Sequence, residues 1–227
     1  MDLARATWPQ VEATGGHHVL AVPLGSLEQH GPHLPLDTDS RVAVAVAQGL
    51  AARRAGVAVA PAVAYGASGE HAAFPGTLVV GHEVLAALLV ELVRSARSHF
   101  AGVVLVSAHG GNEEALSLLR ARCTADGDDV VVWPLRAAGG DAHAGRTETS
   151  LMLAIDAAAV RLELAEAGCT DPLDALLPRL RAEGVRPVSS NGVLGDPAGA
   201  SAEEGRALLD TLVRDLAAAV DARWSGR

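Results

Sequence analysis

The chain has 227 residues and a formal net charge of -9 at pH 7, which argues against nucleic acid or an anionic membrane as a main partner. Its two cysteines show no repeating spacing, which argues against a disulfide framework and favours a reducing compartment. The N-terminal residues lack the apolar core of a signal peptide, and no apolar run is long enough to span a bilayer. We therefore expect a soluble cytoplasmic protein that forms one domain over residues 1–227.

Apolar runs and amphipathic segments alternate along the chain. The expected strands are His17–Leu24, Val57–Ala64, Thr77–Val80, Gly102–Val106 and Asp129–Leu135. The expected helices are Ser40–Arg54, His82–Ser98, Glu113–Ala125, Thr147–Asp156, Asp171–Arg181 and Ser201–Trp224. The alternation predicts an α/β fold in which a mostly parallel, doubly wound sheet is flanked by helices. Turn residues in the late segment Val185–Pro197 predict a loop or a strand hairpin.

The segment Leu24–Ser40, LGSLEQHGPHLPLDTDS, places carboxylates and imidazoles between glycines and prolines. Such a segment forms neither a regular helix nor a central strand, so it predicts a loop at the carboxyl end of the first strand. Open α/β sheets bind their ligands at that edge. Glu28, His30 and Asp39 together offer the oxygen and nitrogen donors that a divalent metal needs, although Asp39 alone would also suit a helix cap.

Three later loops also follow expected strands and carry histidines. The loop over residues 65–77 contains His71, and SAHGGN places His109 before two glycines, which allow a close backbone approach. The glycine-rich loop over residues 137–150 contains His143 and Glu148, and Glu148 would also suit a capping role in the first helical turn. Because parallel strands end at the same edge of a sheet, these loops predict one shared site.

The combined donor set is rich in carboxylates and imidazoles and contains no cysteine. Its members are Glu28, His30, Asp39, His109 and Glu148. The set fits a two-metal hydrolytic site in which one carboxylate bridges the ions, with zinc, iron(II) or manganese favoured over magnesium or calcium. His143 is left to transfer a proton to the departing nitrogen of an amide. Serine or cysteine nucleophiles find less support, because no GxSxG elbow surrounds Ser107 and neither cysteine lies in a histidine-bearing loop.

Four segments, LGSLEQHGPHLPLDTD, GEHAAFPGT, SAHGGN and HAGRTETS, resemble in order and spacing the signature segments of the creatininase family of metal-dependent amidohydrolases. The late segment GVRPVSSNGVLGDPAGASAEEG resembles the branch of that family that matures mycofactocin, a peptide-derived redox cofactor. The resemblance implies a creatininase-like fold, usually in a homohexamer. It also implies cleavage of the modified precursor peptide, which releases its carboxy-terminal Val–Tyr-derived dipeptide.

The resemblance also implies roles for the metal ligands. Glu28 and His30 would each bind one metal, Asp39 would bridge both, and His109 would complete the first site. Creatininase has a glutamate where this chain has Gly111, so the second site needs another acid, for which Glu148 is our candidate.

Other residues receive roles near the ligands or the substrate. His143 matches the proton-transfer histidine of the family, and Asn112 would support the ligands. Glu70 and His71 match a loop near the substrate pocket, where a structural role is an equal alternative for His71. Arg146 would bind a peptide carboxylate or serve as an ordinary surface charge.

Two other functions remain open at this point. A relative of the same family that hydrolyses a cyclic amide or a formamide would use the same metal chemistry with a different pocket. A third hypothesis is that the chain is a non-catalytic metal-binding partner in a peptide-modifying complex. The GVLGDP segment favours the peptidase.

Overall fold

Four parallel strands form the central sheet in the computed structural model, which describes residues 1–136 and 140–224. The strands are β1 (Val19–Leu24), β2 (Val57–Val59), β3 (Gly102–Ser107) and β4 (Val130–Pro134). Their order is β2-β1-β3-β4, and Val19 aligns with both Val57 and Gly102. Every residue of β1 and β3 is buried, as expected for central parallel strands covered on both faces.

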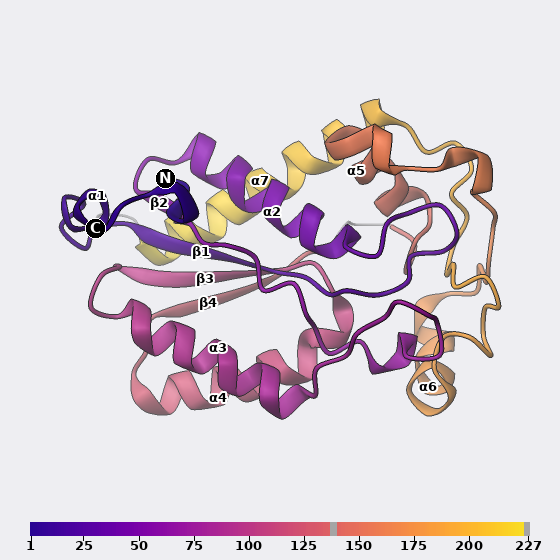
Figure 1. Cartoon of the computed structure of the whole chain (residues 1–227), viewed down its shortest axis with the longest axis horizontal. Coiled ribbons are helices and arrows are strands. Elements are labelled where there is room, and N and C mark those ends of the chain that lie inside the picture. Colours follow the sequence, from indigo (N-terminus) through magenta and orange to yellow (C-terminus); the bar gives the residue numbers. More distant parts are fainter. Residues whose placement is uncertain (137–139, 225–227) are drawn as a thin grey trace.

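Helices cover the two faces of the sheet in separate layers (Figure 1). One layer contains α2 (Thr38–Arg53), α5 (Arg146–Asp156) and α7 (Ala202–Trp224), and the other contains α3 (His82–Ala96) and α4 (Glu113–Asp126). Alternate residues of β1 enter the two cores, so Val19 packs with the α2 layer and Leu20 with the α3 layer. This arrangement confirms the predicted α/β fold.

The smaller elements lie outside these layers. They are α1 (Trp8–Glu12), α6 (Leu173–Glu183) and the short 3₁₀ helices Leu3–Arg5, Gly69–His71, Gly110–Asn112, Ala157–Ala159 and Leu162–Leu164. The helix α6 lies near the end of the sheet at which β1 and β3 finish (Figure 1). Within the described residues, no helix is long and apolar enough to cross a membrane.

Several element boundaries differ from the sequence-based expectations. The second strand stops at Val59 because Pro61, which lacks an amide hydrogen, interrupts the ladder. The expected strand Thr77–Val80 is instead extended chain with an isolated bridge between Leu27 and Leu78. The helix expected from Asp171 begins at Leu173, after Pro172. Part of the expected loop over residues 137–150, at 137–139, lies outside the described residues.

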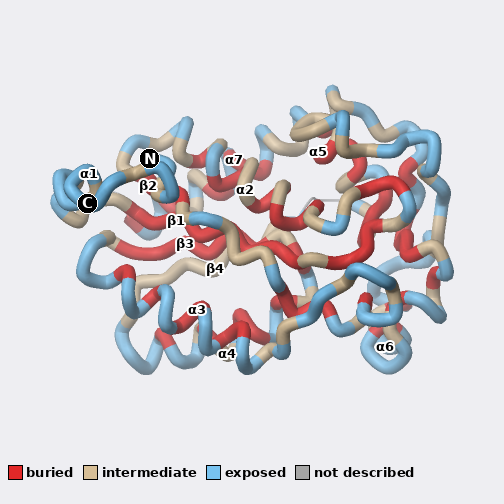
Figure 2. The backbone as a smooth tube through the Cα atoms, in the orientation of Figure 1, coloured by how far each residue is buried: buried red, intermediate tan, exposed pale blue. Residues whose placement is uncertain are grey.

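Burial extends beyond the strands into the loop that follows β1 (Figure 2). Glu28 and His30 in that loop have no exposed surface, although charged groups are rarely buried without a partner. The late segment, a loop rather than a hairpin, reaches the same region, because the Leu194 amide donates to the carbonyl oxygen of His143 at 2.9 Å. The fold therefore encloses a polar cluster at one end of the sheet.

Candidate metal centre

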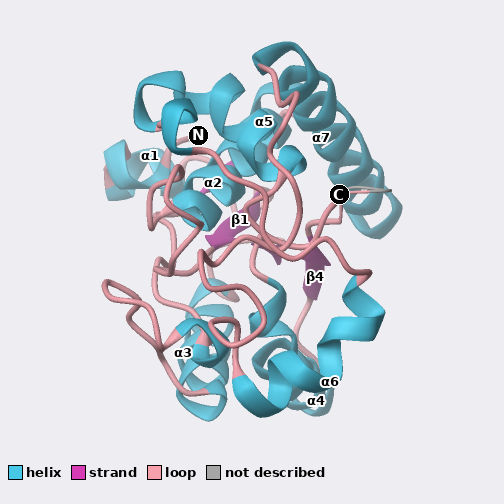
Figure 3. Cartoon of the chain, turned by 90° about the vertical axis from the view of Figure 1, so that its right-hand side faces the viewer, coloured by secondary structure: helices cyan, strands magenta, loops and turns pink. Residues whose placement is uncertain are grey.

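Loops from all four strands converge at the carboxyl edge of the sheet (Figure 3). The loop after β1 carries Glu28 and His30, and the first turn of α2 carries Asp39. His71 follows β2 and His109 follows β3. The chain after β4 supplies His143 and, from the first turn of α5, Glu148. Tertiary structure thus brings together every residue predicted to bind metal.

Asp39 lies between two groups of ligand atoms. Its Oδ1 is 3.2 Å from His30 Nε2, and its Oδ2 is 3.5 Å from His109 Nδ1. Glu28 Oε1 lies 3.2 Å from the same nitrogen of His109. On the other side, Glu148 Oε2 lies 3.9 Å from His30 Nε2. A carboxylate with one oxygen toward each group has the placement needed to bridge two metal ions.

Each of the His30 and His109 rings has one nitrogen toward this carboxylate and the other toward a different acceptor. His30 Nδ1 is 3.1 Å from the carbonyl oxygen of Glu28, which only accepts, so Nδ1 carries a hydrogen and Nε2 is the nitrogen that a metal would bind. His109 Nε2 is 3.4 Å from the Ala67 carbonyl oxygen and 3.4 Å from Glu70 Oε1, so Nδ1 is the nitrogen that a metal would bind. The two nitrogens that face Asp39 are therefore placed for metal ligation, once a metal displaces the hydrogens that they carry.

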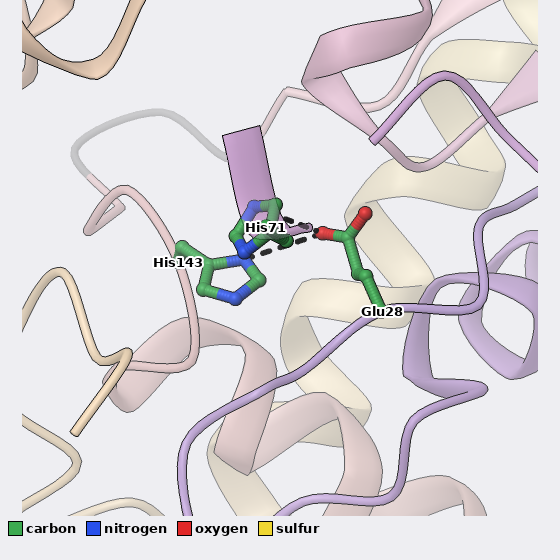
Figure 4. A group of neighbouring side chains, drawn as sticks. All are labelled: Glu28, His71 and His143. Atoms are coloured by element: carbon green, nitrogen blue, oxygen red, sulfur yellow. Dashed lines mark ion pairs between the residues drawn. The ribbon is translucent and has the colours of Figure 1, made fainter. Parts of the chain in front are cut away.

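Two further histidines face one carboxylate oxygen of Glu28 from the same side (Figure 4). Oε1 of this glutamate is 3.3 Å from His71 Nε2 and 3.8 Å from His143 Nδ1. Three overlapping groups consequently have ligand atoms within 4.8 Å of one another: Glu28, His71 and His143; His30, His143 and Glu148; and Glu28, Asp39 and His109. Geometry alone therefore offers more ligands than one ion needs.

Several carboxylate oxygens of the cluster are buried without a hydrogen bond within the described part of the chain, which shows whether these residues suit a metal ion. Both carboxylate oxygens of Glu28 and Oδ2 of Asp39 are buried and accept no hydrogen bond from the described residues. An uncompensated buried carboxylate would cost several kcal/mol, whereas a divalent cation would satisfy these oxygens. The donor set of oxygens and imidazole nitrogens suits zinc, iron or manganese. The residues fit a metal centre.

The pKa values of the ligand groups show how protons compensate the carboxylates when metal is absent. Burial lowers the pKa of His30, but the Asp39 carboxylate outweighs it and raises that pKa to about 10. Burial likewise lowers the pKa of His109, whereas Glu28 raises it to about 10. Burial raises the pKa of Glu28, but His109 and His71 hold it well below its usual value. Metal must displace these protons, so metal binding weakens as the pH falls.

The pKa values of three other groups in the cluster shift so as to favour their uncharged forms. Burial raises the pKa of Glu148 to about 7 and lowers the pKa of His71 to about 4. Burial and the neighbouring His30 hold the pKa of His143 well below its usual value. His143 is therefore neutral at pH 7 and has a free lone pair, which a group that accepts a proton requires.

The other predicted residues occupy different positions. Asn112 is fully buried and ties two loops together, since Oδ1 accepts from the Ala67 amide at 2.8 Å and Nδ2 donates to the Gly25 carbonyl at 3.2 Å. Glu70 lies beside His109 and lines a cavity that opens onto the cluster, described below. Arg146 is exposed and pairs with Glu204 at 2.8 Å, outside the cavity lining.

Two residues of the first loop had no role in the sequence-based interpretation. His33 Nε2 lies 2.8 Å from Thr149 Oγ1 and so joins this loop to α5, one residue beyond Glu148. Asp37 pairs with Arg41 at 2.7 Å, one helical turn later on the surface. Gln29, whose side chain contacts two site histidines, also had no role predicted from the sequence. Its position between Glu28 and His30 was the only sequence signal.

Gly111 leaves the space that the Glu70 side chain occupies. A Cβ atom at this position would collide with Glu70 Oε1 and His109 Nε2 and would lie 2.6 Å from the Ala67 carbonyl oxygen. The glutamate that the family resemblance implies for creatininase at this position would therefore overlap Glu70. Glu148 reaches the second group of ligand atoms from α5 instead.

Gly111→Ala is expected to lower the free energy of unfolding by about 1–3 kcal/mol, because the added methyl group overpacks against backbone and a buried ring. Urea denaturation of the metal-free protein measures this change. Gly110→Ala is the matched control, since a Cβ atom there meets nothing within 4 Å. Equal stabilities of the two variants would contradict the steric argument.

A cavity of about 1760 Å³ opens onto the cluster. His71, His109, His143 and Glu148 contribute to its lining, together with residues of α6 such as Leu177. Pockets for small molecules usually measure about 300–1,000 Å³. The volume is therefore sufficient for a segment of peptide.

Comparison with known proteins identifies the family. The family model described as creatininase, creatinine amidohydrolase, matches residues 4–220. The chain belongs to the creatininase family. A mycofactocin precursor peptide peptidase of Mycobacterium tuberculosis is 47% identical over 98% of this chain and 91% of its own length. The expectation of a creatininase-family amidohydrolase or peptidase is thus confirmed.

Solved structures of this family support the fold and the metal centre. One, described as "Creatininase Mn", has a TM-score of 0.77 at 27% identity and covers 97% of each chain. A mutant creatininase of the "Zn-Zn type" has a TM-score of 0.75 at 26% identity and covers 97% of this chain and 96% of its own. The buried clusters of this creatininase-family chain are consistent with a two-metal site of that kind.

Proposed function

We propose that this creatininase-family chain is a metal-dependent peptidase that cleaves the modified mycofactocin precursor peptide and releases its carboxy-terminal Val–Tyr-derived dipeptide. The identity of 47% to a peptidase of that name, over 98% of the chain, carries the choice of substrate. The volume of the cavity, which exceeds that of a usual small-molecule pocket, supports a peptide over a cyclic amide.

Two divalent ions per subunit are proposed as cofactors, with zinc, iron(II) or manganese as candidates. Glu28, Asp39 and His109 would hold one ion, and His30, Asp39 and Glu148 the other. Bound in this way, such ions lower the pKa of a water molecule and polarise an amide carbonyl. The unpartnered oxygens of Glu28 and Asp39 support this division of the ligands.

His143 is proposed to transfer a proton to the nitrogen of the cleaved amide. Its Nδ1 faces the cluster, 3.8 Å from Glu28 Oε1 and 4.0 Å from Glu148 Oε2. Its Nε2 is 2.8 Å from the carbonyl oxygen of Gln29, which fixes the ring. A neutral imidazole held beside the reacting groups can accept a proton from the attacking water at Nδ1 and deliver it to the leaving nitrogen.

Substrate contacts are proposed for the cavity wall. Glu70 lines the cavity and supports a role in binding the peptide. Asn112 would act indirectly through the loops that it ties together. For Arg146, the pair with Glu204 favours a surface charge over a contact with a peptide carboxylate. The homohexamer implied by the family resemblance and the cytoplasmic location expected from the sequence stay predictions.

The function is tested by incubating iron- or zinc-loaded protein with the modified precursor peptide and reading the products by mass spectrometry. Release of the terminal dipeptide-derived fragment is expected from the wild type and not from Glu28→Ala. Glu12→Ala, which changes an exposed glutamate on α1, is the matched control. An intact peptide despite two bound metals would overturn the peptidase and redirect assays to cyclic amides and formamides.

A further inference from the structure

Gln29 lies at the centre of the hydrogen bonds behind the metal centre. Its side chain is almost fully buried, and Nε2 lies 2.8 Å from His71 Nδ1, 3.0 Å from the Gly192 carbonyl oxygen and 3.1 Å from His143 Nε2. Its Oε1 accepts from the Gly31 amide at 2.9 Å. One amide side chain therefore contacts both histidines whose roles the cluster geometry leaves open.

Two backbone groups determine which way this amide points. The Gly31 N–H can only donate and the Gly192 C=O can only accept, so Oε1 must face Gly31 and Nε2 must face Gly192. The –NH₂ group of Gln29 has one further hydrogen, and His71 Nδ1 is its nearest partner. His71 Nδ1 consequently accepts, and its ring hydrogen lies on Nε2, 3.3 Å from Glu28 Oε1.

The main chain of Gln29 determines the tautomer of the second histidine. Its carbonyl oxygen lies 2.8 Å from His143 Nε2, and a carbonyl oxygen only accepts. His143 Nε2 therefore carries the ring hydrogen, and Nδ1 keeps a lone pair that faces Glu28 and Glu148. Both amide hydrogens of Gln29 are already committed, so the contact of 3.1 Å between the two Nε2 atoms is not needed as a hydrogen bond.

The late loop is shaped to receive this side chain. Gly192 has φ of +83°, a conformation that favours glycine. A Cβ atom at Gly192 would collide with Gln29 Oε1 and would lie 2.5 Å from its Cδ. The GVLGDP segment, which resembles the peptide-cleaving branch of the family, thus reaches the metal centre through Gln29.

We propose that Gln29 is a positioning residue that sets the tautomers of His71 and His143. As a result, His71 directs a ring hydrogen toward Glu28, and His143 directs the lone pair of Nδ1 toward Glu28 and Glu148. His71 then lies outside the metal-ligand set, because the nitrogen that faces Glu28 is protonated. The tautomers follow from hydrogen bonding alone. The importance of the His143 lone pair for turnover rests on the proposed function.

The tautomers can be read directly by ¹⁵N NMR of zinc-loaded protein labelled in its nine histidines. The ¹⁵N shifts distinguish a protonated ring nitrogen from one with a free lone pair, and His71→Asn and His143→Asn assign the two signals. Wild-type protein is expected to show Nε2–H for both residues. A hydrogen on Nδ1 of His71, or on Nδ1 of His143, would overturn the proposal whatever any variant does.

Gln29→Glu tests the cause of the arrangement, because a carboxylate offers no hydrogen to His71 Nδ1. We expect the His71 hydrogen to move to Nδ1 and kcat for the precursor peptide to fall about 10- to 100-fold, as for other residues that orient metal-site groups, with little change in KM. Gln48→Glu makes the same change on the exposed face of α2 and should match the wild type in kcat, in KM and in the His71 tautomer. Gln29→Met, which also lacks the donor, replaces the first variant if that one does not fold.

The outcomes separate the two proposals. Expected tautomers without peptide cleavage would retain the role of Gln29 and reject the proposed substrate. Peptide cleavage by the wild type together with an unchanged His71 tautomer in the Gln29 variant that folds would reject the role of Gln29 and leave the substrate in place.

Discussion

Asp39→Asn is expected to remove most of the bound metal and to lower amide hydrolysis by at least about 10²-fold, because breaking one buried charge interaction costs about 3–5 kcal/mol. Asp39 has one oxygen near His30 and the other near His109, so both groups of ligand atoms depend on it. An amide nitrogen in place of either oxygen cannot bind a cation. Metal content by mass spectrometry and turnover of the precursor peptide measure the two effects.

The neighbouring Asp37 supplies the control for this variant. It lies two residues earlier, immediately before α2, and pairs with Arg41 on the surface. Asp37→Asn makes the same chemical change and should leave metal content and turnover near wild-type values, since exposed ion pairs contribute about 0–1 kcal/mol. If Asp39→Asn retained two metals and full activity, Asp39 would not be the bridging ligand.

His143→Ala is expected to lower turnover by about 10²- to 10⁴-fold while both metals remain bound, since this is the usual contribution of a general acid or base. The residue is buried, and Nδ1 faces the cluster from 3.8 Å or more. Turnover and metal content should be measured on the same preparation, so that a loss of one is not mistaken for a loss of the other.

The exposed His99, beyond the end of α3, provides the comparison for His143. His99→Ala should match the wild type in both measurements. Loss of a metal ion from His143→Ala would indicate that this histidine is a metal ligand, and it would reject the proposed role in proton transfer. Unchanged turnover of His143→Ala would instead favour the hypothesis that the chain is a non-catalytic metal-binding protein.

Local sequence patterns predicted the elements that carry the site. The apolar run before His109 predicted a buried central strand, and β3 is buried at every residue. Glycines and prolines around Glu28 and His30 predicted a loop at the end of β1, where the structure has it. These features are local because hydrophobic periodicity and missing amide donors act within a few residues. The strand predicted at Thr77–Val80 was wrong, since a short apolar run also suits extended chain that packs on a loop.

The sequence by itself determined the parallel fold, the loops at one edge of the sheet and the identity of five proposed ligands. Only the tertiary structure decided how the surrounding groups pair. Gln29 and His143 are 114 residues apart, and Glu70 fills the space at Gly111 from another loop. Arg146 pairs with Glu204, 58 residues away, rather than facing the cavity. Such contacts depend on how helices and loops pack in space, and the direction of a buried hydrogen bond depends on the partner that packing supplies.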